Sequence, residues 1–201
     1  MPTGDWVQLM HDGSLHWIVI TTIGAQEGEI NIYDSLYSFL SEKTEIQIAS
    51  ILFYQGKRIK CNFKKFQQQT GGVDCGLFAV AAATHLCHGA DPSEFTYDQP
   101  LMRRHFLKCL ENKHITVFPT KYDDAGFIKK KPIKLRYIEI CSECHLPCTG
   151  GKNGKDVVKC NSCDKMTHMS CLPSLYIAYR LKDPRCVECK GMQRRRKLLQ
   201  L

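Results

Sequence analysis

Four pairs of cysteine or histidine residues constrain the fold of this chain more than any other feature of its sequence. Within each pair, two residues separate the two members. A two-residue gap lets both side chains of a tight turn reach one ion, and a tetrahedral zinc site needs two such pairs. Cysteines clustered in this way favour metal over disulfides in a reducing compartment. The sequence therefore predicts two structural zinc ions and a small fold that depends on them. The ligands are Cys141, Cys144, Cys160, Cys163, His168, Cys171, Cys186 and Cys189.

The single histidine is the fifth of these eight ligands, and in this the segment resembles the plant homeodomain (PHD) finger. The resemblance implies a cross-braced arrangement, in which alternate pairs share an ion. One ion would then be held by Cys141, Cys144, His168 and Cys171, and the other by Cys160, Cys163, Cys186 and Cys189. Cys148 and His145 are further donors, which we expect to be spare.

The finger also departs from the PHD pattern. A tryptophan usually stands two residues before the seventh ligand, where this chain has Pro184. Aromatic residues often precede the histidine, where this chain has Met166 and Thr167. Between Cys141 and Cys189 the only aromatic residues are Tyr176 and Tyr179, so an aromatic cage for methyl-lysine is poorly supplied. A histone tail or another protein stays open as a partner.

The first part of the chain is predicted to alternate strands and helices. β-Branched and aromatic residues predict a hairpin of strands at 15–23 and 29–36. Helical spacing predicts a helix over 37–56, a further strand is expected at 59–69, and the apolar segment 75–89 predicts a buried helix. The longest apolar run is too short to cross a bilayer and the N-terminal residues form no signal peptide. We therefore expect an intracellular protein, nuclear or cytoplasmic, with no membrane partner.

Cys75 lies at the predicted start of that buried helix, directly after a turn containing Gly71 and Gly72. Unpaired N–H groups and the helix dipole favour an anion at this position, which lowers the pKa of a thiol. Cys75 is therefore a candidate nucleophile. The alternative is a small apolar residue that packs the first turn.

A thiol nucleophile needs a base, a group that orients the base, and donors for an oxyanion. His16 begins one hairpin strand, Asp34 ends its partner, and Gln69 lies six residues before the cysteine. Singly these residues are weak evidence, since a strand histidine is often solvated or structural and Asp34 could cap the next helix. Their combination is more informative.

The motifs HW at 16–17, YDS at 33–35 and QTGGVDCG at 69–76 carry that combination. In order and spacing they resemble the ubiquitin-like-protein-specific cysteine proteases, the SUMO or sentrin type. The resemblance implies an α+β, papain-like cysteine protease fold. It also implies a ubiquitin-like modifier or its conjugates as partner, and hydrolysis after a glycine tail through a thioester.

The resemblance assigns a role to each matching residue. Cys75 would be the nucleophile, His16 the general base and then acid, and Asp34 the group that fixes the imidazole tautomer. Gln69 would donate to the oxyanion beside the backbone N–H of Cys75. Trp17 would cover the slot for a diglycine tail.

Other features qualify this interpretation. Members of the family usually have a substantial stretch before the catalytic histidine, so the resemblance implies a domain truncated at its N-terminus. Asp74 is expected to be a cap or a first-turn acidic residue of the helix, and His85 and His88 to be structural. The alternative function is a catalytically inactive, mobile-element-derived protein whose zinc finger binds chromatin or another protein; in a mobile element the protease substrate need not be a modifier.

Charge divides the chain in the same place as the motifs. Residues 1–128 carry 11 Lys+Arg and 14 Asp+Glu (11 − 14 = −3), and residues 129–201 carry 17 and 6 (17 − 6 = +11). The basic part could contact nucleic acid or serve nuclear import, although a solvated tail is the commoner explanation. We predict a peptidase domain at 1–120, a basic linker at 121–136, a PHD-type finger at 137–192 and a basic tail at 193–201.

Overall fold

The computed structural model describes residues 4–52, 54, 56–121, 134–148, 156–172, 185–186 and 188–190. The chain divides into two compact units: one contains residues 2–44 and 60–136, the other residues 45–59 and 137–201. Most of the predicted linker and the whole predicted tail lie outside the described residues, as do Pro184, Tyr176 and Tyr179. No helix in the described part of the chain has the length and apolar character that a membrane span requires.

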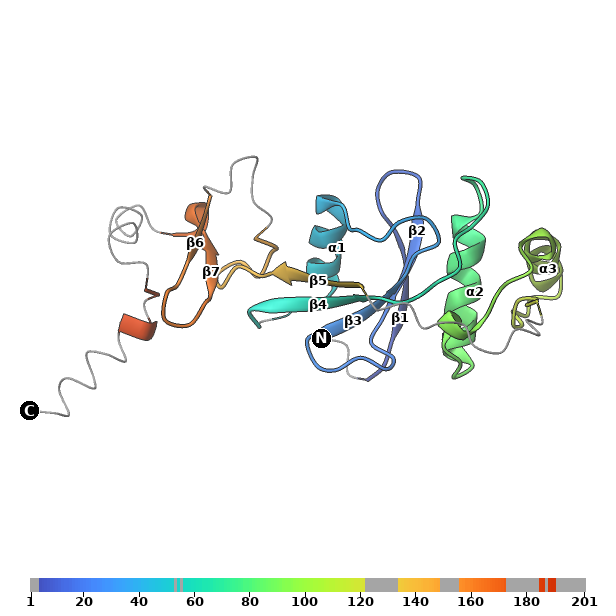
Figure 1. Ribbon diagram of the computed structural model, residues 1–201, viewed down its shortest axis with the longest axis horizontal. Helices are drawn as coiled ribbons and strands as arrows, with labels where there is room; N and C mark the ends of the chain where they lie inside the picture. Colours follow the sequence, from blue (N-terminus) through green and yellow to red (C-terminus); the bar gives the residue numbers. More distant parts are fainter. Residues whose placement is uncertain are drawn as a thin grey trace, which may run out of the picture. The chain divides into compact units, whose positions relative to one another are not determined.

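The first unit is built on a β-sheet. Strand β2 (Trp17–Thr21) runs antiparallel to both of its neighbours, β1 (Val7–His11) and β3 (Glu29–Tyr33), and β4 (Arg58–Phe63) runs parallel to β3 (Figure 1). The order of these strands in the sheet is β1-β2-β3-β4. The predicted hairpin is confirmed as β2 and β3, while β1 was not predicted.

Two predicted elements are shorter than expected. The predicted helix over 37–56 is α1 (Glu42–Leu52), because the backbone N–H of Tyr37 is bound by the carboxylate of Asp34 instead of starting a helix. Ser41 caps α1 through its hydroxyl, which accepts the N–H of Thr44. The predicted strand at 59–69 ends at Phe63, where β4 ends.

The two longer helices of the first unit lie to one side of its strands (Figure 1). Helix α2 (Cys75–Cys87) packs on β1 and β2, and α3 (Gln99–Glu111) packs on α2. A short 3-10 turn, η1 (Pro92–Glu94), connects them. The predicted buried helix is confirmed as α2, whereas α3 was not predicted.

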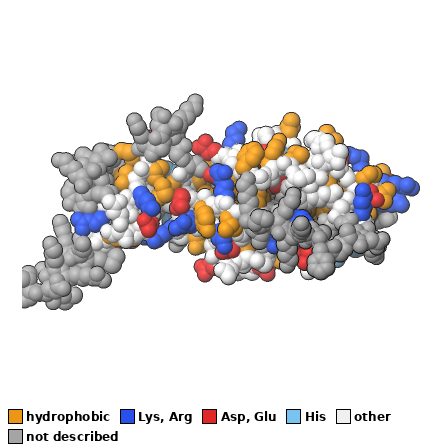
Figure 2. Space-filling view, in the orientation of Figure 1, with side chains coloured by type: hydrophobic (Ala, Val, Ile, Leu, Met, Phe, Trp, Pro, Cys, Tyr) orange, Lys and Arg blue, Asp and Glu red, His pale blue; other side chains and the backbone are white. Residues whose placement is uncertain are grey.

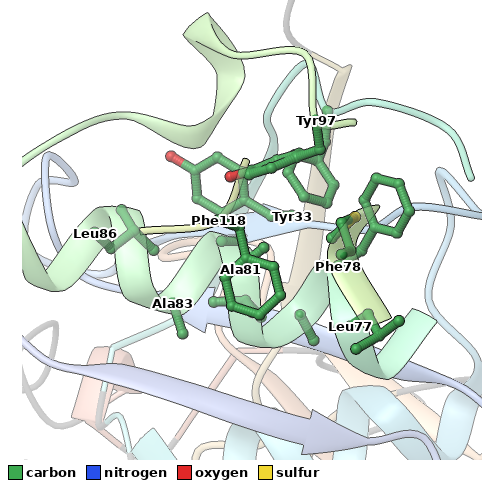
Figure 3. Close-up of a cluster of buried hydrophobic side chains, with 13 residues drawn as sticks. Tyr33, Leu77, Phe78, Ala81, Ala83, Leu86, Tyr97 and Phe118 are labelled. Atoms are coloured by element: carbon green, nitrogen blue, oxygen red, sulfur yellow. The ribbon is translucent and has the colours of Figure 1, made fainter. Parts of the chain in front are cut away.

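Helix α2 is apolar on nearly all sides because it is covered on nearly all sides. Its alanines permit close approach, and larger rings from other elements fill the space beside them (Figure 3). Tyr33, Tyr97 and Phe118 are among these rings, each at most 2 % exposed. This packing fixes α2, and with it the position of Cys75 at its first residue.

The second unit contains short elements. Besides most of α1, these are the second half of β5 (Lys134–Glu139), which begins inside the predicted linker, β6 (Val157–Lys159), β7 (Met166–His168) and the 3-10 turn η2 (Met169–Cys171). β6 and β7 form an antiparallel pair.

Candidate active site and candidate metal centre

His16 and Asp34 form a buried pair where β2 begins and β3 ends. Antiparallel pairing places these two strand ends side by side. The His16 Nε2 atom lies 2.7 Å from Asp34 Oδ1, and the two side chains are 5 % and 4 % exposed. The same Oδ1 atom accepts the backbone N–H groups of Leu36, at 2.8 Å, and Tyr37, at 2.9 Å. Asp34 therefore orients the histidine. It also binds the backbone of the turn that follows β3, which is close to the capping role considered as its alternative.

The second ring nitrogen of His16, Nδ1, is not used by Asp34. Among the described residues, the buried Nδ1 atom has no hydrogen-bond partner. Burial lowers the pKa of His16, but the hydrogen bond to Asp34, the charge of that carboxylate and the nearby Cys75 together raise it above its ordinary value of 6.5. The protonated imidazole is thus favoured beside Cys75.

Cys75 is the first residue of α2 and is buried. Its Sγ atom lies 3.8 Å from the carbonyl oxygen of Leu15. Asp74 makes no side-chain cap, so no capping side chain occupies the N–H groups of the first helical turn. The structure therefore places the predicted thiol close to His16 and beside free helix N–H groups.

Gln69 is buried and its amide orientation is fixed by two hydrogen bonds. The Ser35 hydroxyl donates to Gln69 Oε1 at 2.7 Å, and Gln69 Nε2 donates to the Gly71 carbonyl at 2.8 Å. An amide nitrogen carries two hydrogens, so one N–H remains for another acceptor. Ser35 was not singled out from the sequence, although it stands next to Asp34 in the YDS motif.

Trp17 follows His16 and is 42 % exposed. Its ring lies edge-on to His11, with centroids 5.0 Å apart. A Cβ atom added to Gly76 would stand 3.7 Å from Trp17 Cδ1, so the indole contacts the first turn of α2. Leu15 and Val73 are also strongly exposed. Leu15 and Trp17 lie near Cys75 in the fold, and Val73 two residues before it in the sequence, and all three side chains stay open to solvent.

Asp74 has only part of the role expected from the sequence. Instead of capping α2, its carboxylate accepts hydrogen bonds from Gln99, at 2.8 Å, and Arg103. Its φ of −107° and ψ of 6° differ from the extended backbone typical of a capping residue. Asp74 therefore stands at the N-cap position of α2, as expected, but its side chain does not cap the helix.

His85 and His88 make local contacts of a structural kind, as expected. His85 Nδ1 lies 3.2 Å from the Ala81 carbonyl and 3.1 Å from the Tyr97 hydroxyl. His88 Nδ1 lies 2.8 Å from the Thr84 carbonyl. Neither histidine belongs to a group of metal-ligand atoms within the described residues.

The eight predicted metal ligands gather into two groups of four. Within each group, all candidate ligand atoms lie within 4.8 Å of one another. Neither Cys148 nor His145 belongs to a group. One group is Cys141, Cys144, His168 and Cys171, and the other is Cys160, Cys163, Cys186 and Cys189.

Two turns of the same design deliver the first pair of each group. The N–H of His145 donates to the Cys141 carbonyl at 3.1 Å, and the N–H of Asp164 donates to the Cys160 carbonyl at 2.9 Å. His145 and Asp164 both have positive φ, 58° and 61°. Each turn therefore reverses just after its second cysteine and aims both thiols the same way.

The donor atoms fit a thiolate-binding metal such as zinc. His168 Nε2 lies 3.0 Å from the Pro147 carbonyl, which orients the ring and leaves Nδ1 for an ion. Burial raises the pKa of Cys141 and Cys160, but backbone N–H donors outweigh it, giving pKa values of about 7 and about 6. Burial, with the charges of Cys141 and Cys144, raises the pKa of Cys148 to about 12. Burial and neighbouring thiols also raise the pKa of Cys171, to about 11, so it is the distances that separate Cys148 from the ligands.

Basic side chains of the second unit are in part paired. Lys159 lies 3.1 Å from Asp164, and Lys165 lies 2.8 Å from Glu188. On the face shown in Figure 2, blue basic side chains are interspersed with acidic and apolar ones. Most of the basic segments that suggested nucleic-acid contact, at 129–136 and 190–201, lie outside the described residues, so that contact stays a possibility from the sequence.

Comparison with known proteins agrees with the first unit. Residues 8–125 match the family model described as the Ulp1 protease family, C-terminal catalytic domain. This segment is more than half of the 201-residue chain and contains His16, Asp34, Gln69 and Cys75. It ends before the first metal ligand. Neither a curated protein nor a solved structure matches the chain.

Proposed function

The chain belongs to the Ulp1 protease family, and we propose that it hydrolyses the peptide or isopeptide bond after the glycine tail of a ubiquitin-like modifier. The family supports a cysteine peptidase that acts on ubiquitin-like proteins. The observation that carries the proposal is the buried His16–Asp34 pair, 2.7 Å apart, whose second ring nitrogen is left for Cys75.

In the first half of the proposed reaction, the thiolate of Cys75 attacks the carbonyl carbon of the last glycine. His16 has taken the thiol proton and gives it to the leaving amine as the C–N bond breaks. This leaves a thioester on Cys75. Asp34 accepts the Nε2–H of His16 throughout, so Nδ1 is the nitrogen that exchanges the proton.

In the second half, His16 takes a proton from water, which attacks the thioester carbon and releases the glycine carboxyl group. The proton returns to the thiolate of Cys75 and the enzyme is regenerated. In both halves the oxyanion would accept the N–H of Cys75 and the second amide hydrogen of Gln69. Trp17 would line the channel for the glycine tail.

A modifier bearing a C-terminal propargylamide tests this proposal. Such probes form a covalent adduct only with a nucleophile that the bound tail approaches. We expect the parent chain to be labelled by a SUMO or ubiquitin probe, and labelling to be lost in Cys75→Ala and His16→Ala. Cys87→Ala is the matched control, because Cys87 is an exposed thiol on the same helix. A parent chain that no modifier probe labels would contradict the proposal.

A second function is supported by the two groups of metal ligands. We propose that they bind two structural zinc ions in a cross-braced, PHD-type finger, and that the finger binds a protein such as a histone tail. Zinc would supply the covalent cross-links that the small core lacks. Binding of unmodified histone peptides by the isolated protein, measured by fluorescence anisotropy, tests this role. A nuclear or cytoplasmic location is part of the same proposal.

A further inference from the structure

Two residues at the start of α3 hold the loop that joins the proposed oxyanion donors. We infer that Gln99 and Arg103 are positioning residues, which fix Gln69 and Cys75 relative to each other without touching substrate. The inference rests on the proposed function, because this placement matters only if these groups serve an oxyanion.

Gln99 binds both ends of the loop. Its Oε1 atom accepts the Thr70 N–H at 2.8 Å, and its Nε2 atom donates to the Thr70 carbonyl at 2.8 Å. Nε2 also donates to Asp74 Oδ2 at 2.8 Å. Thr70 directly follows Gln69, and Asp74 directly precedes Cys75. One side chain therefore spans the interval between the two proposed donors.

Arg103 lies one helical turn after Gln99 and donates to the other carboxylate oxygen of Asp74. An unpaired carboxylate next to Cys75 would oppose formation of a thiolate, and the guanidinium offsets that charge. The arginine side chain is 69 % exposed, so the ion pair adds little stability in itself. Arg103 instead fixes the orientation of the Asp74 carboxylate and offsets its negative charge.

The loop needs this support because it has little of its own. Gly71, Gly72 and Val73 are exposed, and a Cβ atom added to either glycine would meet nothing within 4 Å. In the described part of the chain, the side chains that hydrogen-bond the loop from another helix or strand are those of Gln99 and Arg103.

The start of α3 is itself held by the core. Tyr97, two residues before Gln99, is fully buried. The Gln67 side chain accepts the Tyr97 N–H and donates to the Tyr97 carbonyl at 3.2 Å. The Gln67 side chain thus binds the segment before α3, and the Gln99 side chain of α3 binds the loop after Gln67. Gln99 therefore connects the loop to a rigid support.

Two reactions of Cys75 separate positioning from folding. Alkylation by iodoacetamide displaces iodide from carbon and forms no oxyanion, so it reports the thiolate and His16 only. Hydrolysis of a modifier ending in Gly-Gly-aminomethylcoumarin passes through an oxyanion and needs both donors. Both rates would be measured on the full chain, for the parent and for Gln99→Ala, Gln99→Glu and Arg104→Ala. Arg104 is the control, an exposed arginine next to Arg103.

We expect Gln99→Ala to lower kcat about tenfold or more, with KM and the alkylation rate changed less than about twofold. Gln99→Glu should also lower kcat, and it should slow alkylation as well, because it adds a carboxylate beside Asp74 that opposes formation of the thiolate. Arg104→Ala should leave all three unchanged. Equal losses of alkylation and hydrolysis in Gln99→Ala, or unchanged hydrolysis, would overturn the inference. A parent chain that is alkylated in a His16-dependent manner but hydrolyses neither a SUMO nor a ubiquitin substrate overturns the proposed function, and the inference with it.

A double-mutant cycle gives an independent test. If Gln99 acts by placing Gln69, then Gln69→Ala combined with Gln99→Ala should lower kcat little more than Gln69→Ala alone. Losses that multiply would show that the two residues act separately, and would overturn the inference.

Discussion

Asp34 determines which nitrogen of His16 is available to Cys75. Its carboxylate accepts from Nε2 and is itself fixed by two backbone N–H groups, so the imidazole cannot turn without breaking a buried charged hydrogen bond. The same carboxylate is a cause of the raised pKa of His16. Orientation and protonation of His16 therefore both depend on the Asp34 side chain.

Replacing Asp34 by asparagine should lower the pKa of His16. The amide keeps the size of the side chain but removes the negative charge that stabilises the imidazolium. An NMR titration of the His16 ring measures the shift. Asp5→Asn, which removes an exposed carboxylate, is the matched control. A His16 pKa that is the same in the parent and in Asp34→Asn would contradict this account.

The raised pKa of His16 also predicts how stability varies with pH. Between the unfolded value of about 6.5 and the higher folded value, the folded state binds more protons than the unfolded state. The free energy of unfolding should therefore fall as pH rises through this window. Urea unfolding at several pH values measures the slope, and Asp34→Asn should reduce it. A slope of opposite sign in the parent would contradict the prediction.

At the same scale, the sequence predicted the catalytic candidates but not the residues that support them. Residues 67–69 are three consecutive glutamines, and each side chain has a different partner. Gln67 binds Tyr97, Gln68 binds the Asp34 carbonyl and Gln69 binds Ser35. Only spacing from the cysteine singled out Gln69. Gln99 could not be found in this way, because its partners lie 25 and 29 residues earlier and depend on the fold.

Among the elements, α2 links the core to the candidate site. Phe78 lies three residues after Cys75, is fully buried and packs edge-on against Phe66 and Tyr97, with centroids 6.0 and 5.9 Å apart. Loss of this ring would leave a cavity beneath the first turn of the helix. The position of the thiol therefore depends on aromatic packing.

Phe78→Ala should lower the free energy of unfolding by about 3–5 kcal/mol, the usual cost of removing a buried aromatic ring. Chemical denaturation followed by circular dichroism measures the loss. The Leu107 side chain on α3 is 56 % exposed, so Leu107→Ala should change the free energy of unfolding by less than about 0.5 kcal/mol. Equal effects of the two substitutions would show that the described core is wrong.

The elements differ in how well the sequence predicted them. The hairpin and α2 follow from strong apolar patterns, while α1 starts later than predicted because Asp34 binds the backbone before it. Helix α3 was missed although signals were present: Pro100 stands in its first turn, and the buried Met102 and Cys109 are seven residues apart. Strand β1 has only five residues, and its burial depends on pairing with β2.

At the scale of the whole molecule, the two units are stabilised by different means. The first has an aromatic and aliphatic core. The second contains most of α1, with buried Ile48 and Leu52, and a segment that brings eight candidate ligands together with short β-strands. The fold of that segment should depend on metal. The spacing of the ligands predicted the four pairs, because a tight turn fixes two thiols regardless of the rest of the fold. Which pairs share a group followed from the resemblance to the PHD finger, and the two observed groups agree with it.

Metal analysis should find about two zinc ions per chain, since each tetrahedral site uses four of the ligands. Cys144→Ser should reduce the content to about one, whereas Cys148→Ser should leave it at about two, because Cys148 belongs to neither group. Removal of zinc by a chelator should change tryptophan fluorescence little, because Trp6 and Trp17, the two tryptophans of the chain, lie in the first unit. If Cys148→Ser lost an ion as readily as Cys144→Ser, the assignment of ligands would be wrong; a large fluorescence change on chelation would show instead that the first unit depends on the metal.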